Sequence, residues 1–104
     1  MKVQSVATEA AALAHKLTKH LAGRGTGDQL RRAAASVVLN TAEGLGYEGA
    51  NERKFLRIAY ASCQEATAAV QILAMSDQVD LESARDLYRK LHRSGGMLYG
   101  LLRK

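Results

Sequence analysis

Apolar residues recur every three or four positions along nearly the whole chain, in four stretches separated by glycine-rich or polar turns. This spacing places the apolar side chains on one face of an α-helix, and no stretch shows the alternation that a β-strand requires. The 104 residues include no proline, so no helix contains the residue that costs about 3 kcal/mol in a helix interior. The pattern therefore predicts an all-α chain with a single domain over residues 1–104.

Glycines and capping residues mark the ends of the predicted helices. Thr26 is a candidate N-cap and forms a capping box with Gln29, three residues later. Asn51 and Asp80 are the N-cap residues expected for the last two helices. The helices are expected at about residues 4–22, 26 to 44 or 46, 51 to 75 or 76, and 80–104.

Short connections between long helices favour antiparallel neighbours. We therefore expect an antiparallel up-down-up-down four-helix bundle. Aromatic residues make up only 5% of the chain, so the core must be built from Ala, Leu and Val, whose small side chains let helices approach closely.

The composition is that of a soluble globular protein, with 47% hydrophobic and 24% charged residues. Cys63 is the single cysteine, which excludes an intrachain disulfide and is expected to be a buried thiol. The sequence contains no evident signal peptide and no apolar run of membrane-spanning length, so a cytoplasmic location is expected. The net charge of +5 permits weak binding to polyanions.

The second helix carries a polar stripe that its packing does not need. Its members recur at three- or four-residue spacing and are Gln29, Arg32, Ser36, Asn40 and Glu43. Because a carboxylate late in a helix opposes the helix dipole, we expect Glu43 to pair with Arg53 or Arg57. The predicted polar network comprises Arg32, Asn40, Glu43, Ser62 and Glu65. The network is either structural, in which case Glu43→Ala lowers stability, or a ligand site.

The sequence contains no recognisable motif for metal-dependent or nucleophilic catalysis. A di-metal bundle needs Glu-x-x-His pairs, but the residues three before His15, His20 and His92 are not acidic. The glycine-rich turn at residues 23–27 follows a helix and lacks the Gly-Lys-Ser/Thr ending of a phosphate loop. We expect no catalytic residue, metal or cofactor. A bundle-type enzyme is the least favoured of three function classes.

Basic residues form three groups, near the first turn, at the start of the third helix and along the fourth. The residues predicted to contact RNA or DNA phosphates are Arg31, Arg32, Arg53, Lys54 and Arg57. Glu48 and Glu52 are expected to offset the cations at the start of the third helix. Aromatic interleaving is sparse, so the expected contact is electrostatic and tolerant of sequence.

Two blocks of this sequence resemble a known protein family. The first runs from Gln29 to Ala34 and continues through Ser36, Val37, Asn40 and the stretch Ala42-Glu43-Gly44 to Gly46; the second comprises Phe55, Leu56, Ile58, Ala59, Ser62 and Glu65. Together they are similar to the four-helix bundle proteins encoded by intervening sequences in bacterial 23S ribosomal RNA genes. The resemblance covers about residues 28–75.

This resemblance implies a left-handed bundle that assembles into a ring, typically a homopentamer, and relatives that bind nucleic acid. Two positions at which the family often has a basic residue are Tyr47 and Tyr60 here, which weakens the implied nucleic-acid site. Two function classes stay open beside the enzyme. One is a non-enzymatic, oligomeric bundle that contacts RNA or DNA, and the other is a protein-binding scaffold or adaptor without a nucleic-acid role.

Overall fold

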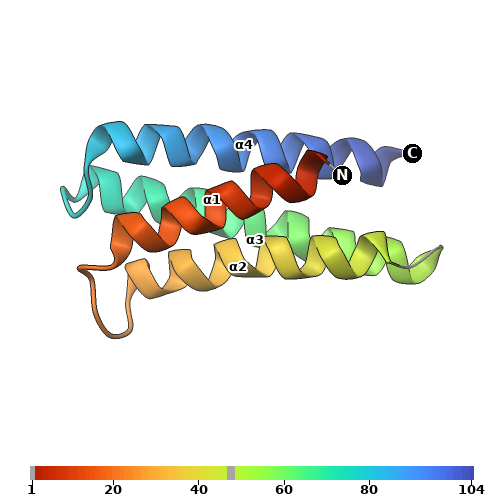
Figure 1. Ribbon diagram of the computed structural model, residues 1–104, viewed down its shortest axis with the longest axis horizontal. Helices are drawn as coiled ribbons and strands as arrows, with labels where there is room; N and C mark the ends of the chain where they lie inside the picture. The colour runs from red at the N-terminus through yellow and green to blue at the C-terminus, as the bar shows by residue number, and fades with distance from the viewer. Residues whose placement is uncertain (1, 47–48) are drawn as a thin grey trace.

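The computed structural model describes residues 2–46 and 49–104, and four α-helices account for most of them (Figure 1). They are α1 (Lys2–Thr18), α2 (Thr26–Leu45), α3 (Ala50–Met75) and α4 (Leu81–Arg103). No strand occurs in this described part of the chain, so the predicted all-α class is confirmed. Tyr47 and Glu48, on which two of the sequence expectations fall, lie outside the described residues.

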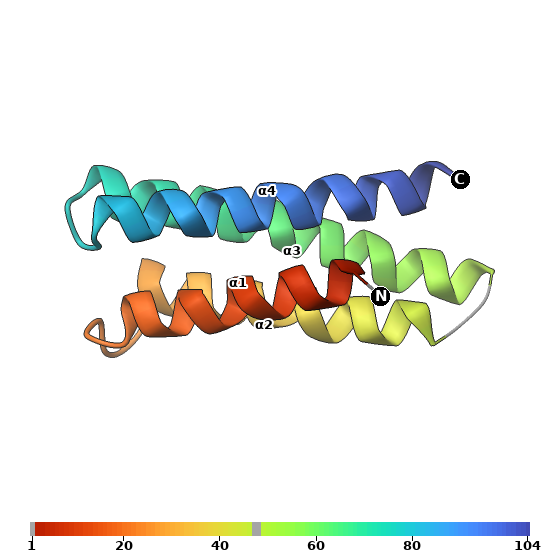
Figure 2. The same cartoon turned by 45° about the horizontal axis from the view of Figure 1, so that its top comes forward.

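The helices alternate in direction and form an antiparallel four-helix bundle, as predicted. Each helix packs against the next one in sequence, and α4 closes the bundle by packing against α1 (Figures 1 and 2). Over the described residues the diagonal pairs, α1 with α3 and α2 with α4, bring no Cα atoms within 8 Å of each other. The bundle measures 42 × 23 × 18 Å. One end holds the start of α1, the end of α4 and the α2–α3 connection (Figure 1).

Aliphatic and small side chains fill the core, as the composition predicts. Six leucines are almost fully buried, namely Leu30, Leu56, Leu73, Leu87, Leu91 and Leu98. Burying each leucine stabilises the fold by roughly 1.5–3 kcal/mol. Buried alanines from α1, α2 and α3, among them Ala14, Ala34 and Ala59, let the helices pack closely.

The predicted helix starts have different outcomes. The Asp80 carboxylate accepts a hydrogen bond from the Ser83 backbone N–H at 2.9 Å and caps α4 as predicted. The predictions of Thr26 and Asn51 as N-caps are wrong, because Gly25 and Gly49 occupy those positions with φ of 153° and 69°. Glycine adopts these positive φ values without strain, so backbone geometry rather than side-chain capping sets both starts.

The α1 helix ends at Thr18, earlier than predicted. The Thr18 carbonyl accepts the Leu21 backbone N–H at 2.8 Å in a turn, so the chain leaves the helix there. The Thr18 hydroxyl is buried and donates to the Ala14 carbonyl. Leu17 lies in α1 and Leu21 lies in the turn that follows, and both pack against the core. The apolar spacing in the sequence therefore continues past the end of the helix.

Candidate nucleic-acid interface

The centre of the α2–α3 interface holds a cluster of three polar side chains. The hydroxyls of Ser36 and Ser62 are 2.7 Å apart, and one donates to the other. The Asn40 amide donates to the Ser36 carbonyl at 2.9 Å and to the Ser36 hydroxyl at 3.0 Å. Ser62 is buried. These bonds satisfy polar groups between two packed helices, which explains part of the polar stripe by structure.

Arg32 and Glu65 lie beside this cluster, on the rim of a hollow between α2 and α3. The hollow has a volume of about 360 Å³, and its lining includes Gln29, Ser36 and Ser62. Arg32 lies 3.7 Å from the Asp28 carboxylate, and its side chain is 79% exposed. Of the predicted network, Arg32, Ser62 and Glu65 therefore share one hollow, and Asn40 joins them through Ser36.

Glu43 stands apart from this network. Its side chain is exposed, and among the described residues its carboxylate forms no ion pair. The predicted pairing with Arg53 or Arg57 is wrong, because the Arg53 guanidinium donates instead to the carbonyls of Leu102 and Lys104. Removing the Glu43 carboxylate should therefore change stability little, contrary to the sequence expectation.

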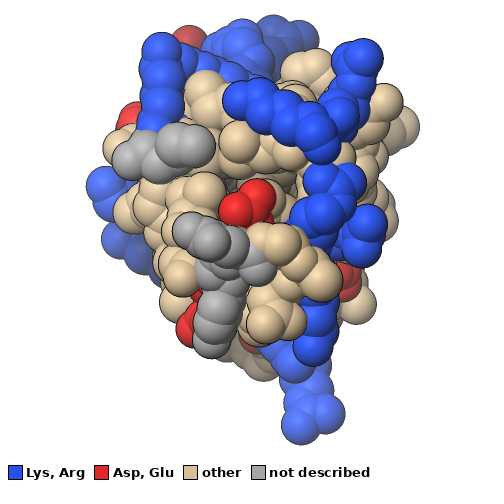
Figure 3. All heavy atoms as spheres, turned by 90° about the vertical axis from the view of Figure 1, so that its right-hand side faces the viewer, with Lys and Arg blue, Asp and Glu red and all other residues tan. Residues whose placement is uncertain are grey.

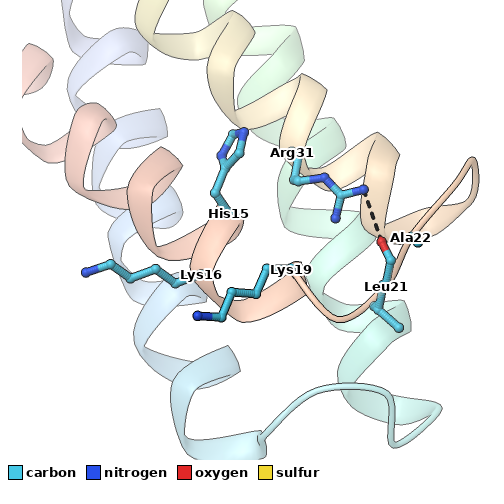
Figure 4. Close-up of a pocket in the computed structure, with 6 residues that line it drawn as sticks. All are labelled: His15, Lys16, Lys19, Leu21, Ala22 and Arg31. Carbon is cyan, nitrogen blue, oxygen red and sulfur yellow. Dashed lines mark hydrogen bonds between the residues drawn. The ribbon is translucent and has the colours of Figure 1, made fainter.

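Arg31 is a structural residue that joins α2 to the end of α1. Its guanidinium donates to the Thr18 carbonyl and hydroxyl, both at 2.9 Å. It also donates to the Leu21 carbonyl at 3.2 Å, the bond drawn in Figure 4. The side chain is only 19% exposed. The same region forms a hollow lined also by His15, Lys16 and Lys19. Because Arg31 satisfies carbonyls at a helix C-terminus, it is poorly placed to meet a phosphate.

Arg53 joins α3 to the end of α4, as Arg31 joins α2 to the end of α1. A cation near a helix N-terminus opposes that helix's dipole, yet Arg31 and Arg53 both lie near the start of a helix. In each case the guanidinium reaches the C-terminal carbonyls of the antiparallel neighbour, where the dipole favours a positive charge. Two of the five predicted phosphate contacts are thus hydrogen bonded within the fold.

Exposed cations from three helices gather at the end of the bundle that holds both chain ends. This basic end comprises Lys2 of α1, Lys54 and Arg57 of α3, and Arg103 and Lys104 at the end of α4. Figure 3 looks onto this end and shows Lys and Arg side chains along its upper and right-hand edges. Lys2, Arg103 and Lys104 were not among the residues predicted from sequence, because only the topology brings them beside α3.

The five predicted phosphate-binding residues do not form one surface. Arg31 and Arg32 lie near the start of α2, whereas Arg53, Lys54 and Arg57 lie near the start of α3. The helices are antiparallel, so these two groups are near opposite ends of the bundle (Figure 1). Roughly 20 Å of helix lies between Arg32 and the end of α2, at 1.5 Å per residue.

Sequence reasoning also missed a hollow between α3 and α4 that is lined by aromatic side chains. Its volume is about 460 Å³, and its lining residues are Tyr60, Gln64, Thr67, Tyr88, His92, Gly95, Gly96 and Tyr99. The available signal was the spacing of Tyr88, His92 and Tyr99, which places all three on one face of a helix. Aromatic residues are few in this chain, but the fold concentrates them.

Cys63 has the environment of a core residue and not that of a reactive thiol. Burial raises the pKa of the Cys63 thiol from 9.0 to about 11, and the thiol donates to the Leu91 carbonyl. Among the residues that the structure describes, no three His, Cys, Asp or Glu side chains cluster as a metal site. Across the same residues, none of the helices has the length and hydropathy needed to cross a bilayer.

Comparisons with known proteins agree with this architecture. A crystal structure at 1.70 Å of a protein of unknown function from the S23 ribosomal protein family of Bacteroides thetaiotaomicron VPI-5482 superposes with a TM-score of 0.86. The two sequences are 17% identical, over 98% of this chain and 99% of that chain, so this similarity shows the fold alone. No curated protein matches the sequence.

The family model described as 23S rRNA-intervening sequence protein matches residues 1–100. The match extends the sequence resemblance from its two blocks on α2 and α3 to nearly the whole chain, α1 and α4 included. This protein therefore belongs to the 23S rRNA-intervening sequence protein family.

Proposed function

We propose that this protein is a non-enzymatic, self-associating helical bundle that binds the phosphates of RNA or DNA through its basic end. The observation that carries the proposal is the convergence of exposed cations from α1, α3 and α4 on that end. Phosphate contacts of this kind release condensed counterions, which makes binding favourable and dependent on salt.

The charge at the basic end is available to a ligand. Lys54 and Arg57 are exposed, as are Lys2, Arg103 and Lys104. Arg53, their neighbour, is instead hydrogen bonded to the end of α4 and holds that helix beside α3. Arg53 therefore holds two helices together, while the five cations of the basic end remain exposed to solvent on the bundle.

Binding rather than catalysis is supported by the environment of the chain's best nucleophile. A thiolate is the reactive form of cysteine, whereas Cys63 is buried and its raised pKa, about 11, keeps the thiol neutral at physiological pH. Two of the three histidines, His15 and His20, use a ring nitrogen to contact a backbone carbonyl. Cys63 is therefore part of the packed core, while both histidines lie at the surface.

Self-association is supported by an apolar stripe on the outer face of α3. Its members recur at three-, four- or seven-residue spacing and are Ile58, Ala61, Ala68, Ile72 and Met75, with the exposed Glu65 between Ala61 and Ala68. Ile72 is 54% exposed and Met75 is 88% exposed. A second copy of the chain is the occupant we propose for this outer stripe, in a ring of five as the family resemblance implies. The same stripe is what favours the alternative, a scaffold that recruits a different protein.

Charge reversal at the basic end tests the proposal. The double variant Lys54→Glu, Arg57→Glu should bind single-stranded RNA weakly and lower the salt slope by about 1.4, because each phosphate contact on a single strand contributes about 0.7. The matched control is Lys16→Glu, Lys19→Glu, which makes the same change in net charge at the opposite end. Equal losses in both variants, or no binding by the parent protein at low salt, would overturn the proposal and favour the scaffold.

A further inference from the structure

Three of the chain's five aromatic side chains line one hollow between α3 and α4, although aromatic residues are only 5% of the sequence. Tyr60 comes from α3, and Tyr88 and Tyr99 come from α4, together with the His92 ring. Tyr88 is 36% exposed and Tyr99 is 50% exposed. Core packing would bury such rings, so their exposure along one hollow leaves ring surface free for a ligand.

The rings form two pairs along α4. Tyr88 and His92 stack with an angle of 7° between their planes and 6.0 Å between their centres. Tyr60 and Tyr99 reach across from α3 and α4 with centres 6.0 Å apart and an angle of 40°. Between the two pairs, Gln64 adds an amide that can both donate and accept hydrogen bonds. Flat apolar surfaces with a polar group between them are complementary to a flat heterocycle.

Two glycines open the hollow between the aromatic pairs. At Gly95 an added Cβ would lie 3.4 Å from the Cys63 sulfur, so close packing with α3 explains this residue. At Gly96 an added Cβ would have no atom within 4 Å. Glycine is a poor helix former, and packing gives no reason for it at residue 96. Its effect is to leave empty the space that a side chain would occupy beside the rings.

Positive charge borders the hollow. The Arg103 guanidinium lies 5.7 Å from the centre of the Tyr99 ring, and Arg103 is also part of the basic end. Arg57 precedes Tyr60 by three residues, which places both on one face of α3. Arg85 lies beside Tyr88 in the lining of a smaller adjoining hollow. The described lining of the aromatic hollow contains no acidic residue.

We propose that this aromatic hollow binds unpaired bases of single-stranded RNA or DNA, whose phosphates continue onto the basic end through Arg103. Stacking on exposed aromatic rings next to arginines is a general means of binding single strands without reading their sequence. The inference rests on the proposed phosphate-binding function and adds to it the part of the ligand that the hollow accepts. Tyr60, which replaces a basic residue expected from the family resemblance, becomes a stacking contact.

The test compares a short oligothymidylate with an abasic strand of the same length, which has the same phosphates but no bases. The parent protein should bind oligothymidylate at least roughly five-fold more tightly, because stacking of even one base is worth about that factor. The chain has no tryptophan, and three of its four tyrosines line the hollow. Most tyrosine emission therefore comes from the hollow and should be quenched by oligothymidylate alone.

Gly96→Leu is the variant that blocks the hollow without disturbing the core, because an added Cβ there has open space around it. Ala12→Leu is the control, since Ala12 is exposed on α1, a helix that contributes no lining residue to the aromatic hollow. Gly96→Leu should lose the preference for oligothymidylate and keep its affinity for the abasic strand. Ala12→Leu should keep both.

Equal affinity of the parent protein for the two strands, with unchanged tyrosine emission, would overturn the base-binding inference and leave the phosphate-binding proposal standing. Failure to bind either strand at low salt would overturn both. A base preference that survives in Gly96→Leu would show that bases bind elsewhere, which also contradicts the inference. Circular dichroism of both variants separates these outcomes from a failure to fold.

Discussion

Gly44 and Gly96 are helical glycines in opposite environments, and they show how local space decides the effect of one methyl group. At Gly44 an added Cβ would lie 2.8 Å from Leu56 Cδ2 and 3.2 Å from the Glu52 carbonyl. Leu56 is only 1% exposed and has no room to move aside. At Gly96 the corresponding space is open.

Gly44→Ala should therefore destabilise the fold by about 1–2 kcal/mol, because overpacking exceeds the gain in helix propensity. Gly96→Ala should stabilise it by up to about 1 kcal/mol, since only propensity changes. Chemical denaturation of the two variants beside the parent protein checks both signs. Two shifts in the same direction would contradict this description of the α2–α3 contact.

Cys63 gives a prediction about pH. Burial raises the pKa of its thiol from 9.0 to about 11, so the folded state holds the proton more tightly than the unfolded state. The resulting stabilisation is complete below pH 9 and is lost as the pH rises towards 11. Between these values the parent protein should lose stability more steeply than Cys63→Ala in denaturation curves. Parallel curves would contradict the prediction.

The contacts of individual residues were the hardest feature to predict from the sequence. The polar stripe on α2 was visible as a pattern, but its meaning depended on α3, which supplies Ser62 to Ser36. Glu43 looked in need of a partner, yet it is solvated at the helix surface. Helical spacing identifies which side chains share a face, but it does not show which face meets which neighbour.

Two arginines connect the termini of neighbouring helices in this fold. Arg31 and Arg53 each extend from the beginning of one helix to carbonyls at the end of its antiparallel neighbour. A cation at the beginning of a helix is locally unfavourable. Such a residue in a bundle sequence therefore indicates a neighbouring C-terminus, a signal that the sequence did contain.

Arg31→Met should destabilise the protein by roughly 1–3 kcal/mol, because it removes charge-assisted hydrogen bonds to Thr18 and Leu21. Its neighbour supplies the control, since Arg32 is 79% exposed and lies only near Asp28. Arg32→Met should change stability by less than about 0.5 kcal/mol. Urea denaturation measures both, and similar values for the two variants would contradict the structural role of Arg31.

The helices themselves were predictable because their apolar spacing is long and regular. All four helix starts lie within two residues of their predicted positions, three of the four C-terminal ends lie within one residue, and Asp80 has its predicted role. Gly25 and Gly49 were missed as the capping residues because a positive φ depends on the path of the whole connection. Side-chain capping rules do not contain that information.

The proposed assembly depends on the surface of the whole bundle. The bundle buries its core within one chain, yet the outer stripe on α3 leaves Ile72 and Met75 largely exposed. Contact with a second copy would remove this apolar surface from water. The order of the helices could be predicted from their short connections, whereas the basic end and the aromatic hollow emerge only when distant segments are placed together.

Ile72→Glu, Met75→Glu should convert an oligomer into a monomer, because it places carboxylates in an apolar contact. Light scattering should give the parent protein a mass of several times 11.2 kDa, and five times if the ring is a pentamer. Ala12→Glu, on the exposed face of α1, is the control and should leave the mass unchanged. A parent protein that is monomeric at micromolar concentration would contradict self-association.

The most direct test of the phosphate-binding account is the affinity of the parent protein for a short RNA single strand, measured across a series of salt concentrations. If three to five cations of the basic end contact phosphates, the logarithm of affinity should fall linearly with the logarithm of salt, with a slope of roughly −2 to −3.5. An affinity that does not change with salt, or no binding at the lowest salt, would contradict the account.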